Sequence, residues 1–182
     1  AYANALYRDF LETSDVRLLE AFFTQVEYLI ASAVNEDSGA YWQFPFENEH
    51  YRLSSGWYSA MTSGRALGVL ARAHFLSGDK RYIDFAEKVY RKLEKPLAAG
   101  GMVTYVGSEA AWLEEVAGIG AESNKVLNGH IFALASLRDY AHYIGGEEEL
   151  HLVSMAVAAV KGALKEFDAG DRKSTRLNSS HL

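Results

Sequence analysis

The chain has 182 residues, of which 49% are hydrophobic, enough to build one domain with a sizeable core. Its net charge is −6 and no basic run occurs before the last dozen residues, which argues against nucleic acid as a partner. The absence of cysteine excludes disulfides, thiolate metal ligands and a cysteine nucleophile, and no apolar run is long enough to predict a membrane span.

The N-terminal third predicts one helix followed by a long aromatic loop. Apolar residues recur at helical spacing over residues 15–34, and Ser14 is the expected cap. Residues 35–55 break this rhythm, with a short extended piece over residues 40–46 that is rich in aromatic side chains. A loop of about 20 residues inside a compact domain is uncommon and usually functional, so we expect it to cover a site.

Two further helices are predicted over residues 57–76 and 80–95. Ser77, Gly78 and Asp79 provide a stop and a new helix cap between them. One face of the first helix carries small and apolar residues at helical spacing, namely Ala60, Gly64, Leu67, Ala71 and Phe75. Because Gly64 is followed by a glycine four residues later, we expect another backbone to approach this helix closely.

The C-terminal half predicts an irregular region and another pair of helices. Residues 98–123 are irregular apart from a short strand over residues 102–106, and helices follow over residues 125–144 and 147–167. The last helix carries an apolar stripe that needs a packing neighbour, formed by Leu150, Val153, Val157, Val160, Leu164 and Phe167.

The helix pairs form a weak internal repeat. At an offset of 68 residues Gly78 corresponds to Gly146, and apolar positions of the following helices also correspond. Helix, glycine turn and helix separated by long loops are typical of stacked α-hairpins, in a solenoid or an α/α barrel. We therefore predict an all-α fold of α-hairpin repeats belonging to an α/α barrel (toroid), incomplete because five helices are too few to close one.

The last residues differ in character from the rest. Residues 171–181 are polar, basic and aperiodic, and all eleven match the in-frame translation of a common sequencing-library adapter. The alternative is a natural disordered tail. We divide the chain into a partial helical domain over residues 1–170 and a non-native, disordered tail over residues 171–182. On this interpretation the sequence is a metagenomic fragment.

A pair of adjacent carboxylates, Glu114 and Glu115, is the best candidate for acid–base chemistry. The pair follows Trp112 in the second irregular region, and acid–base catalysis needs a positioned carboxylate. Charged residues are usually exposed, so the alternative is a solvated turn. The histidines show no H-E-x-x-H spacing, and we predict no metal site and no cofactor.

Four segments together resemble the C-terminal domain of the D-glucuronyl C5-epimerase family. They are SGWYSAM at residues 55–61, Arg72 with Ala73, W-x-E-E at residues 112–115 and VLNG at residues 126–129. Their order and approximate spacing also agree, over roughly two-thirds of the chain. The family usually has tyrosine on both sides of the glutamate pair, whereas this chain has Leu113 and Val116, and about two extra residues before Val126.

The resemblance implies an α/α barrel and an isomerase (a racemase or epimerase acting on carbohydrates). Such an enzyme inverts carbon 5 of glucuronic acid within a polysaccharide, as in glycosaminoglycan biosynthesis. The resemblance assigns proton transfer to Glu115 and places the tyrosines of the opposite sugar face beyond Gly170. Removing the weakly acidic carbon 5 proton needs a base, and inversion needs a second acid on the opposite face. The fragment is therefore expected to be inactive alone.

Five further residues are candidates for substrate binding: Tyr58, Arg72, Glu114, Asn128 and His130. Each has a structural alternative. Tyr58 suits a packed core, Arg72 suits an ion pair with a local acid, and Glu114 suits a hydrogen-bonding neighbour of the catalytic carboxylate or the surface. Asn128 and His130 lie near a predicted helix start, where asparagine commonly caps or bonds the backbone.

We expect a polysaccharide or oligosaccharide substrate. We expect neither a nucleic-acid partner nor a membrane span, and we leave open whether the protein forms a homodimer. Two rival functions also stay open. One is a polysaccharide lyase or glycosidase on the same helical barrel. The other is a helical-repeat scaffold that binds partners without catalysis.

Overall fold

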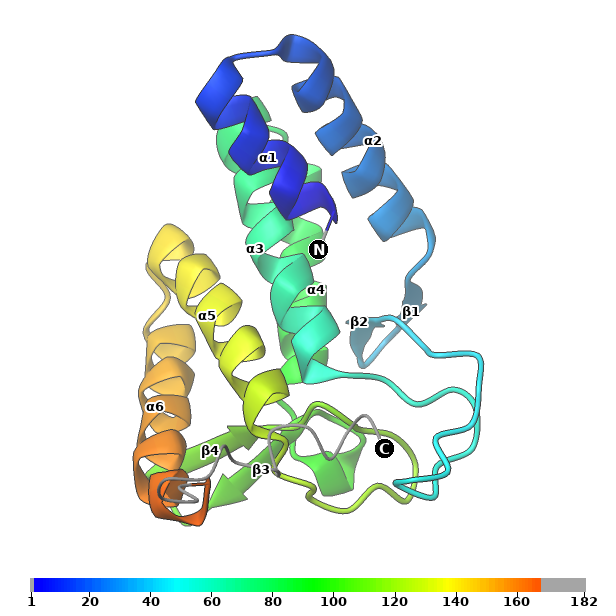
Figure 1. Ribbon diagram of the computed structural model, residues 1–182, viewed down its shortest axis with the longest axis vertical. Coiled ribbons are helices and arrows are strands. Elements are labelled where there is room, and N and C mark those ends of the chain that lie inside the picture. Colours follow the sequence, from blue (N-terminus) through cyan, green and yellow to red (C-terminus); the bar gives the residue numbers. More distant parts are fainter. Residues whose placement is uncertain (1, 168–182) are drawn as a thin grey trace.

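The structure is a computed structural model that describes residues 2–167, so the segment assigned to a non-native tail lies outside the described residues. Three helix pairs and two β-hairpins make up this part of the chain (Figure 1). The elements in chain order are α1 (Tyr2–Thr13), α2 (Val16–Ala31), β1 (Val34–Glu36), β2 (Gly39–Tyr41), α3 (Ala60–Ser77), α4 (Lys80–Leu93), the short 3-10 helix η1 (Leu97–Ala99), β3 (Val103–Val106), β4 (Ala110–Leu113), α5 (Leu127–Ile144) and α6 (Glu147–Phe167).

The predicted helical-hairpin repeat is present, with one difference. Helices α3 and α5 begin at Ala60 and Leu127, and α4 and α6 begin at Lys80 and Glu147, so the offset is 67 residues rather than 68. Gly145, not Gly146, is the counterpart of Gly78. Both glycines end a helix in the left-handed conformation, at φ values of 69° and 71°, which side chains disfavour.

The N-terminal helix pair differs from the prediction. Helix α1 has no counterpart among the predicted elements, and Leu6 is its buried residue. Asp15 rather than Ser14 caps α2, because its carboxylate accepts from the Arg17 amide. Ser14 instead takes a positive φ of 57° at the turn between the two helices. None of the helices in residues 2–167 is long and apolar enough to cross a membrane.

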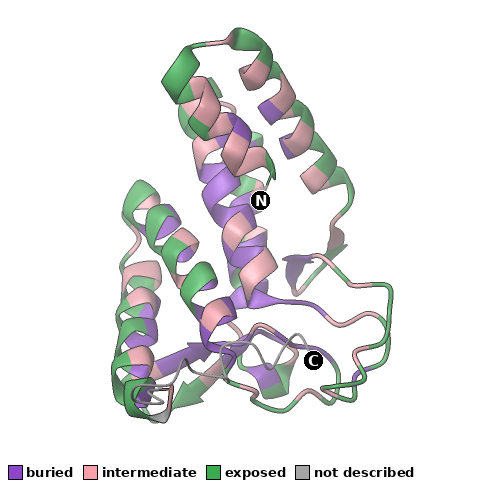
Figure 2. Cartoon of the chain, viewed as in Figure 1, coloured by how far each residue is buried: buried purple, intermediate pink, exposed green. Residues whose placement is uncertain are grey.

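Helix α3 is the centre of the fold and packs against α4 and α5. Buried residues run along most of its length (Figure 2). A Cβ added to Gly64 would lie 2.8 Å from the carbonyl oxygen of Ala133 on α5, which confirms the predicted close approach of another backbone. Phe75 is an exception to the predicted apolar face, because 68% of it is exposed.

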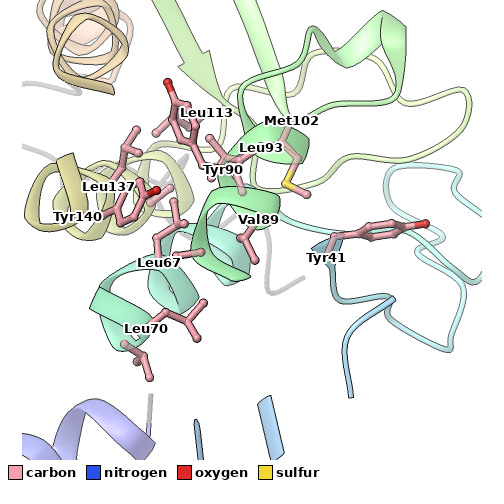
Figure 3. Packing of buried hydrophobic residues seen from close by; sticks show 14 of the residues in the cluster. Tyr41, Leu67, Leu70, Val89, Tyr90, Leu93, Met102, Leu113, Leu137 and Tyr140 are labelled. Atoms are coloured by element: carbon pink, nitrogen blue, oxygen red, sulfur yellow. The ribbon is translucent and has the colours of Figure 1, made fainter. Parts of the chain in front are cut away.

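The core lies where α3, α4 and α5 meet the second β-hairpin. Figure 3 shows side chains from all four elements converging there, including Leu67 on α3, Leu93 on α4, Tyr140 on α5 and Leu113 on β4. All four are almost completely buried. The hairpin therefore forms part of the hydrophobic core, and the glutamate pair follows directly after its second strand, β4.

The apolar stripe of α6 is only partly buried. The side of this helix that contacts the fold is formed by smaller and neighbouring residues, namely Leu152, Met155, Ala156, Ala159 and Ala163. Within the predicted stripe, Leu164 is 52% exposed and Val157 36% exposed. The inward face is thus rotated relative to the stripe of large residues, which agrees with the expectation that this stripe needs a further neighbour.

Candidate active site

Two long loops meet at one end of the helical core and form the candidate site. The loop of residues 42–59 precedes α3 and the loop of residues 114–126 precedes α5, and both lie at the same end of the molecule (Figure 1). Tyr58 and Ala117 join them through two backbone hydrogen bonds of 2.8 Å. The amide of Ala60 also donates to the carbonyl oxygen of Glu114 at 2.9 Å. The start of α3 is thereby fixed to the glutamate pair.

Trp112 belongs to a strand rather than to the predicted loop, and the glutamates follow directly after that strand. Strand β4 pairs with β3 in antiparallel register, with Thr104 opposite Trp112. The pairing continues beyond the strand, because the Glu114 amide donates to the carbonyl oxygen of Met102 at 2.9 Å. A paired β-hairpin therefore sets the position and direction of both glutamates.

Glu114 is completely buried and holds the loop that follows it. One carboxylate oxygen accepts from the Ser123 hydroxyl at 2.6 Å. The other accepts from the backbone amides of Asn124 and Lys125 at 3.1 and 3.2 Å. Three donors satisfy this buried negative charge, as burial of a carboxylate requires. Glu114 thus stabilises the loop that leads to α5 and does not line the cavity beside Glu115.

Glu115 lies at the surface of a cavity and against the start of α5. A Cβ added to Gly129 would overlap the Glu115 side chain, so the carboxylate lies on the first turn of this helix. Backbone N–H groups are exposed at such a turn, and the positive end of the helix dipole favours a negative charge there. The adjoining Glu115 cavity has a volume of about 420 Å³, within the usual range for ligand sites.

A tight hairpin presents Tyr51 and His50 to the Glu115 cavity. Asn48 and Leu53 close this hairpin through two backbone hydrogen bonds of 2.8 and 3.0 Å. The Tyr51 amide donates to the side-chain oxygen of Asn48 at 3.3 Å, and Arg52 takes a positive φ of 53°. Burial raises the pKa of the Tyr51 hydroxyl, and the negative charges of Glu115 and Glu114 raise it further. The phenol is therefore kept protonated near the carboxylate.

A second cavity of about 400 Å³ continues from the first. It shares His50, Tyr51 and Val116 with the Glu115 cavity and adds Arg52. Tyr51 thus lines both the cavity that contains the candidate base and the cavity that contains a cation. The sequence pattern did not single out Tyr51, His50 or Arg52, because nothing local relates residues 48–53 to the glutamate pair.

Tyr58 and Asn128 lie beside the site without lining the Glu115 cavity. Tyr58 is buried, and its hydroxyl donates to the carbonyl oxygen of Gly100 at 2.8 Å. Asn128 lies on the first turn of α5, next to Gly129. Its buried side-chain oxygen has no hydrogen-bond partner among the described residues.

His130 is a core residue, completely enclosed between β4 and α6. Its Nδ1 accepts from the Leu113 amide at 2.9 Å, and its Nε2 lies 3.1 Å from the carbonyl oxygen of Ala156. The ring stacks on Trp112 at a centroid distance of 4.3 Å. Burial lowers the pKa of His130 to about 4, although both hydrogen bonds oppose this shift. The ring is therefore neutral and links the glutamate hairpin to α6.

Arg72 is not brought together with Glu115. It lies in α3, and its guanidinium pairs with the Asp139 carboxylate at 2.6 Å. It also lies over the Tyr7 ring and lines a separate cavity of about 490 Å³ between α1, α3 and α5. Among the described residues, no three histidine, aspartate or glutamate side chains gather closely enough to hold a metal ion.

The family described as the D-glucuronyl C5-epimerase C-terminus matches residues 36–179. The chain belongs to this family. The match covers both loops and the glutamate pair, and extends into part of the segment interpreted as adapter-derived. Membership confirms the resemblance found in the sequence.

Two curated relatives share moderate identity with the chain. An uncharacterized protein of Methanocaldococcus jannaschii, MJ1128, is 29% identical over 166 residues, which cover 85% of this chain and 53% of that protein. A D-glucuronyl C5-epimerase of Caenorhabditis elegans is 26% identical over 167 residues, which cover 82% of this chain and 26% of that protein. The chain therefore spans about half of the first relative and a quarter of the second.

A solved structure with a similar fold is a glycoside hydrolase family 76 (mannosidase) protein, Bt3792 of Bacteroides thetaiotaomicron. The TM-score is 0.63 at 14% identity, and the match covers 88% of this chain and 42% of that one. At this identity the likeness shows the fold alone. It supports the assignment of the helix pairs to an incomplete helical barrel.

Proposed function

We propose that the protein is a uronate epimerase that acts on a glucuronic-acid-containing polysaccharide and inverts carbon 5 by removing and returning a proton. The observation that carries this proposal is the position of Glu115, at the end of β4, against the start of α5 and on the wall of a ligand-sized cavity. Family membership supports the reaction class. Glycosaminoglycan biosynthesis is the setting that this reaction suggests.

Glu115 and Tyr51 are proposed as the two proton-transfer groups. The Glu115 carboxylate takes the carbon 5 proton of glucuronate, and the electron pair left on carbon 5 delocalises into the substrate carboxylate. The Tyr51 hydroxyl then gives a proton to the opposite face of carbon 5, which completes the inversion. Exchange with water restores the carboxylate and the phenol. Tyr51 is thus a candidate, within the described residues, for the group otherwise expected beyond Gly170.

Charge develops on the substrate carboxylate when the proton leaves, and a nearby cation stabilises it. Arg52 lines the adjoining cavity, which shares Tyr51 with the Glu115 cavity, and is the proposed partner of this carboxylate. Arg72 was the candidate suggested by sequence, but its ion pair with Asp139 and its separate cavity favour a structural role. We therefore propose Arg52 in its place.

The test is hydrogen exchange at carbon 5. The protein is incubated in deuterated water with a glucuronate-containing oligosaccharide, and deuterium at carbon 5 is followed by NMR. Because Tyr51 would supply the second group that the sequence placed beyond Gly170, we now expect exchange by the wild-type protein rather than an inactive fragment. We expect none by Glu115→Gln, because the amide cannot accept the proton. Exchange at the wild-type rate in Glu115→Gln would refute the role of Glu115, whereas no exchange by the wild-type protein would favour the non-catalytic scaffold.

A lyase or glycosidase on the same barrel is the second candidate function, favoured by the fold of the mannosidase neighbour. A lyase removes the same proton but then eliminates the neighbouring sugar, so it produces an unsaturated uronate with a new ultraviolet absorbance. A glycosidase produces a new reducing end without carbon 5 exchange. Either product in the same reaction mixture would replace the epimerase proposal.

A further inference from the structure

Lys92 in α4 is a buried cation whose ammonium group lies against two aromatic rings. Among the residues that the structure describes, it is the only buried lysine or arginine, with 7% of its surface exposed. Its Nζ lies 4.4 Å from the centroid of the Tyr41 ring and 5.1 Å from that of the Tyr58 ring. Charged side chains are rarely buried without partners, and the faces of tyrosine rings attract a cation. The two rings therefore replace part of the hydration that Lys92 loses.

A carboxylate from the first β-hairpin completes the surroundings of Lys92. One oxygen of Glu36 lies 3.6 Å from the lysine Nζ, and the other accepts from the Tyr41 hydroxyl at 2.8 Å. This hydrogen bond lowers the pKa of Glu36 and the charge of Lys92 lowers it further, although burial opposes both effects. A Cβ added to Gly39 would lie 2.8 Å from the Cβ of Lys92, so the β1–β2 hairpin packs directly onto the lysine.

The two tyrosine rings lie at the two ends of the loop that carries Tyr51. Tyr41 is the last residue of β2, directly before the loop of residues 42–59, and Tyr58 is near the end of that loop. Their rings meet edge-on with a centroid distance of 4.8 Å. Because bringing the ends of a flexible loop together costs conformational entropy, contacts between these ends restrict the whole loop. Lys92 contacts both rings and thus holds both ends of the loop.

The second end of this loop is also fixed to the segment that follows Glu115. The backbone of Tyr58 exchanges two hydrogen bonds of 2.8 Å with Ala117, which lies two residues after Glu115. Lys92 itself lines neither the Glu115 cavity nor the adjoining one. It can therefore act on the site only through the residues that it holds.

We propose that Lys92 is a positioning residue, which holds the two ends of the loop together through Tyr41 and Tyr58 and so keeps Tyr51 in place at the Glu115 cavity. The inference rests on the proposed function for the role of Tyr51 in proton transfer. The connection between Lys92 and the loop ends rests on the contacts alone, so it is tested separately. The proposal adds a requirement for a positive charge that lies outside both cavities.

The first test is amide hydrogen exchange in Lys92→Met, followed by NMR. Methionine is apolar and of similar length, so it fills the buried space without the charge. Opening of the loop ends exposes the amides of Tyr58 and Ala117, whereas a general loss of stability also exposes the amide of Leu67 in the core of α3. We expect exchange at Tyr58 and Ala117 to accelerate about tenfold and exchange at Leu67 to change by less than about threefold.

Lys80→Met is the matched control, because it makes the same substitution at an exposed position at the start of the same helix. It should leave exchange at all three amides unchanged. Equal acceleration of the three amides in Lys92→Met, or no acceleration, would overturn the role of Lys92 at the loop ends.

The second test compares two products of the carbon 5 reaction in deuterated water. Glu115 is also held by β4 and by the start of α5, whereas Tyr51 depends on its loop. We expect Lys92→Met to slow formation of inverted uronate about tenfold and to slow deuterium entry into glucuronate by less than about threefold. Equal slowing of both would overturn the positioning of Tyr51. If the wild-type protein forms neither product, the proposed function fails, while selective amide exchange at Tyr58 and Ala117 still supports the role of Lys92 at the loop ends.

Discussion

Glu115 lies so close to Gly129 that no side chain fits between them. A Cβ at position 129 would overlap the Cβ of Glu115 and one of its carboxylate oxygens, and would lie 2.6 Å from its Cγ. Gly129 is in the first turn of α5, and the carboxylate rests on this turn. The glycine of the VLNG segment therefore serves the adjacent glutamate rather than a turn, since helical glycine otherwise costs stability.

The first prediction is that Gly129→Ala abolishes carbon 5 exchange by displacing Glu115. The added methyl group meets the middle of the side chain as well as its end, so a small rotation cannot relieve the overlap. We expect a loss of at least about a hundredfold in exchange rate, because displacement of a catalytic group by about 1 Å has effects of this size. Deuterium incorporation measures it.

Gly162→Ala is the control for the first prediction. Gly162 lies in α6, and a Cβ there would meet nothing within 4 Å. Alanine is the better helix former by about 1 kcal/mol, so this variant should be slightly more stable and equally active. Full activity in Gly129→Ala would show that the position of Glu115 does not matter.

The second prediction separates the two glutamates by stability. Glu114→Gln replaces a buried carboxylate that accepts three hydrogen bonds. The NH2 group of the new amide would point at hydrogen-bond donors and could not accept from them. We expect a loss of about 2 kcal/mol in the free energy of unfolding, since hydrogen bonds to charged groups contribute about 1.5–3 kcal/mol. Urea denaturation measures it. Glu109→Gln, at an exposed position of the β3–β4 turn, should change stability by less than about 0.5 kcal/mol.

The third prediction concerns pH and His130. Burial lowers the pKa of His130 to about 4 from an ordinary value of 6.5, so between these values the unfolded chain binds a proton that the folded chain does not. The contribution of the buried neutral ring to the free energy of unfolding is complete above about pH 6.5 and is lost as the pH falls toward 4. We expect the free energy of unfolding to fall by about 2 kcal/mol between pH 7.5 and pH 5.0 because of this residue.

His130→Gln should flatten the pH dependence of unfolding by this amount. His142→Gln provides the comparison, because it makes the same substitution at an exposed position of α5. Identical slopes in the wild-type protein and His130→Gln would show that the buried ring does not titrate in this range.

The repeat and most helix positions could be predicted from the sequence, because glycine turns and apolar periodicity are local signals. Helix α1 was not predicted because Leu6 is the one residue that it buries fully. A single buried residue gives no clear apolar periodicity in the sequence. The strand predicted over residues 102–106 is present as β3, but its partner β4 and the pairing of both hairpins were missed, because strands of three or four residues are too short for a clear alternation. The offset of the repeat was wrong by one residue because Gly145 and Gly146 are adjacent and only the left-handed conformation of Gly145 distinguishes them.

The candidate site could be predicted only in part. The glutamate pair was found from its neighbours in sequence, but the difference between Glu114 and Glu115 depends on the loop of residues 118–126 folding back over β4. Tyr51 reaches the same cavity from a hairpin more than 60 residues earlier in the chain. Contacts of this kind come from tertiary structure and leave no local pattern.

The last prediction tests Tyr51 as the second proton-transfer group. Tyr51→Phe removes only the hydroxyl, so Glu115 can still take the carbon 5 proton from glucuronate and return a deuteron to the same face. We expect deuterium to enter glucuronate while no inverted uronate forms, and NMR of the recovered oligosaccharide distinguishes the two products. Tyr105→Phe is the control, because Tyr105 is a partly exposed tyrosine on β3 that donates to the carbonyl oxygen of Glu94, away from Glu115. If Tyr51→Phe still forms inverted uronate at the wild-type rate, the second proton comes from another group.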